Sequence, residues 1–232
     1  MKRKSENHEA ARAELLRRLA LGDAGGAARL AAYYQAAELK RLYRQGWLKR
    51  GVPESECESV ADHSFGTAIL ALFLAGRPPY EALDRDRALR IALVHELGEV
   101  YAGDITPVDG VAAEEKARLE RASIGRVLAG LPGGEEYLAL WEEFEAGLSP
   151  EARFVRELDR LEMGLQAAAY RAEGNGRMGE FFESARRSVS APGLRAMLEA
   201  AAVATEPGGL DGRGGHADAS DSELPEREAS AG

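Results

Sequence analysis

The segment DHSFGTAILALFLA, residues 62–75, contains the longest uninterrupted apolar run of the chain, the eight residues from Ala68 to Ala75. The run is too short to cross a membrane as a helix, which takes roughly 20 apolar residues. From Phe65 onward a helix of this sequence would be apolar on most of its faces, and such a helix belongs in the middle of a domain. The segment therefore predicts a central helix around which other helices pack.

The sequence on both sides of this run also has the composition of helices. Ala, Leu, Glu and Arg dominate, β-branched residues are sparse, and no alternating apolar and polar segment of strand length is found. Ser149 followed by Pro150 is typical of a helix start. We expect an all-α fold, a single helical bundle, with helices over 6–21, 27–45, 62–75, 85–101, 112–129, 134–146, 150–172, 177–187 and 191–203.

Composition and charge exclude several classes of protein. Of 232 residues 45% are hydrophobic, and the net charge is −9, which predicts a globular protein that does not bind nucleic acid. The basic N-terminus, Met1 to His8, leads into no apolar segment, and Cys57 is the only cysteine. We therefore expect no secretory signal, no disulfide, no membrane contact and a cytoplasmic location.

The negative charge is concentrated near the end of the chain. Residues 206–232 contain seven acids, two arginines and almost no large apolar side chain, so this stretch cannot offset the entropy cost of its own ordering. We expect three parts: an N-terminal amphipathic helix within residues 1–26, one helical domain in residues 27–203, and a disordered acidic tail in residues 204–232.

Two of the four histidines, His63 and His95, lie at predicted apolar helices. In IALVHELGEV, residues 91–100, helical spacing places Glu96 on the apolar face and Glu99 one turn beyond His95. A carboxylate buried without a partner costs several kcal/mol, and a divalent metal ion would stabilise it. The alternative is a core histidine beside a buried ion pair, because structural networks of this kind are common.

Two further residues are ambiguous when each is taken alone. His63 follows Asp62 at the start of its helix, and it is either a capping or surface histidine or a residue that points across the bundle. Asp159 lies at the edge of the apolar face of its helix, and it is either a solvated acid paired with a neighbouring arginine or a ligand.

Taken in order, these residues resemble the H…HD…D pattern of the HD-domain superfamily of metal-dependent phosphohydrolases. The similarity is closest to the HD-domain 5′-deoxynucleotidases and covers about residues 28–190. One position departs from the pattern, since the aspartate of the HD dyad is Glu96 here, whose extra methylene moves the carboxylate by about 1.5 Å. The resemblance is carried by LKRLYRQGW (39–47), ESVADHS (58–64), HELGEVYAGDITP (95–107) and LDRLEM (158–163).

The resemblance implies a metal-dependent enzyme that releases phosphate from nucleoside or deoxynucleoside 5′-monophosphates. Two imidazoles and two carboxylates suit a divalent Mn, Co, Fe or Zn ion, and nothing in the sequence selects among these. The implied ligands are His63, His95, Glu96 and Asp159.

The same resemblance implies four further site residues. Glu99 and Asp104 would act near the attacking water and the departing ester oxygen, as two carboxylates that flank one reacting centre can. Arg44 would contact the phosphate. Trp47 would stack on or pack near the nucleotide, and the alternative for Trp47 is a core anchor after a helix end.

Two other functional classes and one assembly state complete the expectations. The His-Glu dyad leaves a non-catalytic or altered-metal nucleotide-binding protein as the alternative function, whereas a di-iron oxygenase needs more histidines than the predicted body contains. The resembling family is largely dimeric, and the amphipathic segments 6–21 and 112–129 offer more apolar surface than one small bundle needs. We therefore expect a homodimer.

Overall fold

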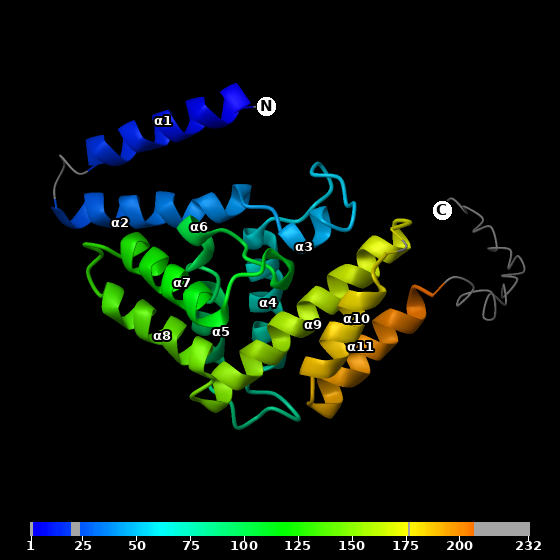
Figure 1. Cartoon of the computed structure of the whole chain (residues 1–232). Helices are drawn as coiled ribbons and strands as arrows, with labels where there is room; N and C mark the ends of the chain where they lie inside the picture. Colours follow the sequence, from blue (N-terminus) through cyan, green and yellow to red (C-terminus); the bar gives the residue numbers. More distant parts are fainter. Residues whose placement is uncertain (1, 20–23, 176, 207–232) are drawn as a thin grey trace, which may run out of the picture.

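The computed structural model describes residues 2–19, 24–175 and 177–206, and every regular element within them is a helix (Figure 1). The only β-type pairing among these residues is an isolated antiparallel bridge between Tyr43 and Ser59. The all-α prediction is confirmed. The predicted tail falls mostly on residues 207–232, which lie outside the described residues.

The helices follow one another with short connections. Two short 3-10 helices, η1 and η2, stand beside the α-helices. In chain order the elements are α1 (Lys2–Leu19), α2 (Ala24–Ala36), η1 (Ala37–Arg41), α3 (Gln45–Leu48), α4 (Val60–Leu74), α5 (Arg85–Val94), α6 (Glu99–Ala102), η2 (Pro107–Asp109), α7 (Ala113–Val127), α8 (Gly134–Ala146), α9 (Pro150–Ala172), α10 (Gly179–Ser188) and α11 (Pro192–Ala204).

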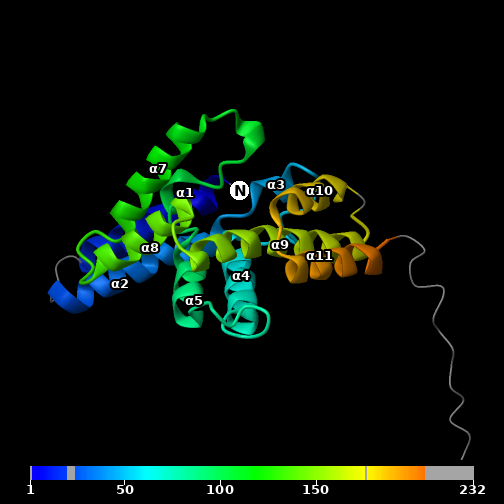
Figure 2. The same cartoon turned by 90° about the horizontal axis from the view of Figure 1, so that it is seen from below.

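Helix α9 is the centre of the bundle. It packs against α4, α5, α8, α10 and α11, and in Figure 2 it runs across the molecule with α4 and α5 on one side. Its start follows the predicted signal, because Ser149 Oγ accepts a hydrogen bond from the Ala152 amide at 3.0 Å and Pro150 occupies the first turn. Residues of α9 are therefore well placed to meet residues of several other helices.

A capping box fixes the start of α4. The Asp62 amide donates to Ser59 Oγ at 3.2 Å, and the Asp62 carboxylate accepts from the Ser59 amide at 2.9 Å. This exchange satisfies amides that have no partner within a helix. It also places His63 in the first turn of α4, where its side chain is fully buried.

The predicted helix over 27–45 ends earlier than expected. Helix α2 stops at Ala36, and after η1 the chain is extended through Arg44. The extended residues pair with the segment before α4, since the Arg44 amide donates to the Glu58 carbonyl at 3.1 Å and the Val60 amide donates to the Leu42 carbonyl at 2.7 Å. This pairing replaces helical hydrogen bonds and brings Arg44 close to α4.

The predicted helix over 85–101 is two helices. Between α5 and α6 the chain makes tight turns, in which the Glu99 amide donates to the Glu96 carbonyl at 3.0 Å. Gly98 sits in this break against α7 and α8, and a Cβ there would lie 2.9 Å from Glu120 Cβ and 3.2 Å from Trp141 Nε1. The close approach of three elements thus requires glycine.

No helix in the described ranges is long and apolar enough to cross a membrane.

Candidate metal centre and active site

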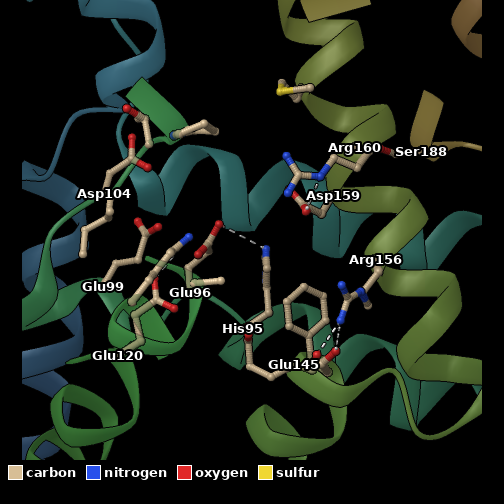
Figure 3. Close-up of a pocket in the computed structure, with 18 of the residues that line it drawn as sticks. His95, Glu96, Glu99, Asp104, Glu120, Glu145, Arg156, Asp159, Arg160 and Ser188 are labelled. Carbon is tan, nitrogen blue, oxygen red and sulfur yellow. Dashed lines mark hydrogen bonds and ion pairs between the residues drawn. The ribbon is translucent and has the colours of Figure 1, made fainter. Parts of the chain in front are cut away.

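The four predicted metal ligands converge. One nitrogen or oxygen atom of each of His63, His95, Glu96 and Asp159 lies within 4.8 Å of the others. His63 Nε2 is 3.1 Å from Asp159 Oδ1 and 3.5 Å from Glu96 Oε1, and His95 Nε2 is 3.6 Å from the same Glu96 oxygen. In Figure 3, His95 reaches toward Glu96, and Asp159 approaches from α9 on the other side of the cavity.

The hydrogen bonds of the two imidazoles leave their Nε2 atoms available. His95 Nδ1 lies 2.7 Å from the Ala92 carbonyl, which can only accept, so Nδ1 carries the proton. His63 Nδ1 lies 2.5 Å from Glu162 Oε2. Both Nε2 atoms are buried and have no hydrogen-bond partner among the described residues. Two such nitrogens facing two carboxylates fit a divalent transition ion.

The electrostatics of the cluster also favour a cation. Burial and the charge of Arg44 lower the pKa of His63, but the carboxylates of Asp159 and Glu162 outweigh both and raise it to about 10. Burial disfavours the charged form of Asp159, yet Arg160 and His63 hold its pKa well below its usual range. The ring proton and a metal ion would compete for the same nitrogen, so metal binding at this cluster would release a proton.

Arg44 links the ligand cluster to the loop after α6. Its Nη1 is 3.3 Å from Glu96 Oε1 and 3.8 Å from Asp104 Oδ1. Burial opposes the charge, but these two carboxylates raise the pKa of Arg44. Asp104 is held in addition by the Gln45 amide, which donates to Oδ2 at 2.5 Å. The structure thus brings two predicted site residues, Arg44 and Asp104, next to the predicted ligands.

Glu99 is a buried carboxyl group with an unused oxygen. Its side chain is 3% exposed, and its Oε2 has no hydrogen-bond partner among the described residues. Burial, assisted by the charges of Glu96 and Asp104, raises the pKa of Glu99 well above its usual range. Burial of this kind favours the protonated form of a carboxyl group, which is the form that can donate a proton.

Of these groups, Arg44, His95, Glu96, Glu99, Asp104 and Asp159 line one cavity of about 1100 Å³, large enough for a nucleotide, and the fully buried His63 lies behind its wall against Asp159 and Glu96. Figure 3 shows Glu96, Glu99 and Asp104 along one side of it and Arg156, Asp159 and Arg160 along the other. The polar groups at the cavity wall include Arg44, His95, Glu96, Glu99, Asp104, Lys116, Glu120, Asp159 and Arg160.

Trp47 lies apart from this cavity. Its side chain is 1% exposed, its Nε1 donates to Glu58 Oε1 at 2.7 Å, and its ring centroid is 3.9 Å from that of Phe181 and 5.2 Å from that of Tyr170. It is not among the residues that line the cavity. Of the two interpretations of Trp47, the geometry favours the core anchor.

Two residues near the site were missed by the sequence reasoning. Glu162 contacts His63, and its position three residues after Asp159 in LDRLEM was a usable signal, because residues three apart share a helix face. Lys116 of α7 lines the cavity and pairs with Glu120 at 3.3 Å. No motif of the sequence marks it.

Comparison with known proteins gives one family and several relatives. The HD domain family matches residues 36–200. The mouse (Mus musculus) protein named 5′-deoxynucleotidase HDDC2 is 37% identical over 179 residues, which are 75% of this chain and 87% of the relative. The solved structure of the PH0347 protein from Pyrococcus horikoshii OT3 has a TM-score of 0.63 and 34% identity, and the match covers 74% of this chain and 97% of that one.

A second solved structure carries a functional description. It is a predicted metal-dependent phosphohydrolase from Magnetospirillum magnetotacticum MS-1, with a TM-score of 0.57 and 27% identity. The match covers 78% of this chain and 96% of that chain. These comparisons agree with the all-α fold and with a metal-dependent hydrolase.

Proposed function

The chain belongs to the HD domain family and to its branch of 5′-deoxynucleotidases, and on this premise we propose that it hydrolyses deoxynucleoside 5′-monophosphates with water to the deoxynucleoside and phosphate. It is a metal-dependent hydrolase. The observation that carries the proposal is the convergence of two imidazoles and two carboxylates at a cavity that also holds Arg44, Glu99 and Asp104.

We propose that the four converging residues hold the divalent ion. When bound, the ion supplies Lewis acidity toward a phosphate oxygen and lowers the pKa of a bound water. The Glu96 carboxylate, despite its additional methylene, has Oε1 at 3.5 and 3.6 Å from the Nε2 atoms of His63 and His95. This geometry supports Glu96 as a ligand, and with it the catalytic function over the non-catalytic alternative.

The remaining groups supply charge and protons. Arg44, buried beside Glu96 and Asp104, would bind the equatorial phosphate oxygens and neutralise their charge. As the water oxygen attacks phosphorus, Asp104 would accept its proton. As the bond from phosphorus to the ester oxygen breaks, Glu99 would donate its proton to that oxygen, consistent with its raised pKa.

A phosphate-release assay tests this function. The full chain, loaded with Mn²⁺ or Co²⁺, should release phosphate from dAMP, dCMP, dGMP or dTMP, and AMP run in parallel measures the discrimination of the sugar. Glu99→Gln should keep its metal and lose roughly 10²–10⁴-fold in kcat, because the proton donor is removed. Glu115→Gln, at an exposed acid of α7, is the control. Metal-loaded wild-type protein that releases phosphate from none of the nucleotides would contradict the proposal.

We also propose a homodimer, with an apolar face of α4 in its interface. Phe65 and Phe73, eight residues apart on α4, are 67% and 62% exposed, and Leu72 lies beside them. The apolar surface of the segment 112–129, which was expected to contribute to a dimer, is used within the protomer, because Ile124 and Val127 are buried in a cluster with Trp141 of α8.

Charge placed on this face should separate the protomers. Wild-type protein should sediment as a dimer at micromolar concentration, and Phe73→Glu should weaken the dimer by more than roughly 100-fold, because a charge without a partner is then buried in an apolar interface. Val203→Glu, at an exposed apolar side chain of α11, is the matched control. A wild-type monomer at that concentration would reject the dimer.

We propose the same three parts of the chain as the sequence predicts: an N-terminal helix within residues 1–26, one helical domain over 27–203 and a tail over 204–232. The domain over 27–203 contains the family match and all of the candidate site residues. Function in the cytoplasm stays a prediction of the sequence.

A further inference from the structure

We propose that Glu162 is a positioning residue of the metal centre, and that Gly66 provides the space its side chain needs. Glu162 orients the His63 imidazole from the side opposite the ion. The inference rests on the proposed metal centre, but it concerns a residue that holds a ligand and does not itself touch the ion.

Two carboxylates of helix α9 lie against the two nitrogens of the His63 ring, and one of them is its hydrogen-bond partner. Asp159 and Glu162 are three residues apart and so share one face of α9. Asp159 Oδ1 is 3.1 Å from Nε2, and Glu162 Oε2 is 2.5 Å from Nδ1. Because an ionised carboxylate only accepts, Nδ1 must donate to Glu162. When Nε2 loses its proton, as metal binding requires, its lone pair points toward the other ligands.

The second imidazole does not depend on another helix in this way. His95 Nδ1 bonds to the carbonyl of Ala92, three residues earlier in its own helix. Of the two ligand histidines, His63 is the one whose tautomer and ring plane are set by a side chain from elsewhere in the fold. A change at Glu162 should therefore act on the metal centre through His63 alone.

Gly66 lies directly against the Glu162 side chain. A Cβ at this position would be 2.6 Å from Glu162 Oε1, 2.9 Å from its Cγ and 3.1 Å from its Cδ, and these are its three nearest atoms. The backbone of Gly66 is ordinary helix, so its conformation does not demand glycine. Glycine inside a helix costs about 1 kcal/mol relative to alanine. Room for Glu162 is the reason the structure gives for it.

Titration with Co²⁺ tests the proposal without reference to activity. Full-length protein stripped of metal is titrated with Co²⁺, and the visible d–d absorption gives occupancy and coordination. Glu162→Ala should bind Co²⁺ roughly 10–100-fold more weakly, the usual effect of losing a partner of this kind. Glu162→Gln should lose less, because its amide oxygen still accepts from Nδ1.

A double-mutant cycle connects the two residues. Gly66→Ala should weaken Co²⁺ binding in the wild-type background, because its methyl group displaces the Glu162 carboxylate. In the Glu162→Ala background the same substitution should cause no further loss, since the side chain it displaces is gone. Additive losses in Co²⁺ affinity would show that Gly66 acts by another route and would overturn that part of the proposal.

Two matched controls separate positioning from general stability. Glu151→Gln removes the charge of another α9 acid that is 8% exposed, as Glu162 is, and that accepts from the Asp84 amide. Gly125→Ala adds a methyl group to a glycine of α7 that has nothing within 4 Å of a built Cβ. Both controls should keep the wild-type Co²⁺ affinity and spectrum.

The possible results point to different conclusions. Wild-type protein that fails to bind Co²⁺ would overturn the metal centre and this inference together. Wild-type protein that binds Co²⁺, with a Glu162→Ala variant of equal affinity and spectrum, would overturn the inference and leave the proposed function intact. If thermal melting shows that Glu162→Ala does not fold, the Co²⁺ affinities of Glu162→Gln and Gly66→Ala are compared with that of the wild type instead. Wild-type Co²⁺ affinity in both variants would overturn the inference.

Discussion

Replacing His63 or Asp159 with alanine should remove bound metal and phosphate release together. Each variant leaves three of the four converging groups. Of the two imidazoles, His63 lies closer to the two carboxylates, at 3.1 Å from Asp159 and 3.5 Å from Glu96. The expected loss of kcat/KM is about 10³-fold or more, because the ion contributes several kcal/mol of transition-state stabilisation and each 1.36 kcal/mol is a factor of ten.

Metal analysis of the purified variants, alongside the phosphate assay, measures both effects. His8→Ala, in α1, and Asp86→Ala, at an exposed acid in the first turn of α5, are matched controls and should keep both metal and activity. Stoichiometric metal in both His63→Ala and Asp159→Ala would mean that the ligand set is wrong, whatever happens to activity.

The second large effect is expected at Glu96, where the chain departs from the pattern of its family. Glu96→Ala should lose metal and turnover, whereas Glu96→Asp should keep activity with a different metal optimum. Glu96 Oε1 lies 3.3 Å from Arg44 Nη1 and also 3.5 Å from His63 Nε2. The carboxylate could therefore be a metal ligand or the structural partner of a buried arginine.

The two roles of Glu96 predict different measurements. Orphaning a buried charge usually costs about 3–5 kcal/mol, so a purely structural Glu96 would show mainly in the melting temperature of Glu96→Ala. Arg44 also lies 3.8 Å from Asp104, a partner that the substitution does not remove, and this reduces the cost. We expect metal occupancy to change more than melting temperature. A Glu96→Ala protein with wild-type metal affinity and phosphate release would reject the ligand assignment.

The all-α fold and the convergence of the four candidate ligands could be predicted because each left a periodic or ordered signal. Apolar spacing indicated α4 and α9, and the order of His63, His95, Glu96 and Asp159 resembled a known pattern. The break after Val94 left no such signal, because it depends on Gly98 meeting α7 and α8. Helical periodicity describes a segment alone, and such a contact becomes visible only when distant segments are packed together.

The same limit explains why the position of Trp47 was left open and why the contact of Glu162 with His63 was not predicted. Trp47 packs against Phe181, which is distant in the sequence. The sequence alone therefore could not distinguish a buried core position for Trp47 from a position at the nucleotide. Glu162 meets His63, 99 residues before it. Its carboxylate looked like one of many charged residues on a helix. Long-range pairs of this kind are specified by topology, and no local pattern distinguishes them.

The contacts of Asp159 and Glu162 with the His63 ring also help to determine how α9 is aligned against α4. Helices α4 and α9 bury mainly small and aliphatic side chains, among them Ala68, Ala71 and Leu161, and such surfaces tolerate rearrangement. Sliding α9 by one residue would turn its side chains by about 100° and advance them by about 1.5 Å, which takes both carboxylates from the ring at once. A misaligned core would thus contain an unpaired buried imidazole. The site residues therefore destabilise the wrong alignment of α4 and α9 relative to the native one.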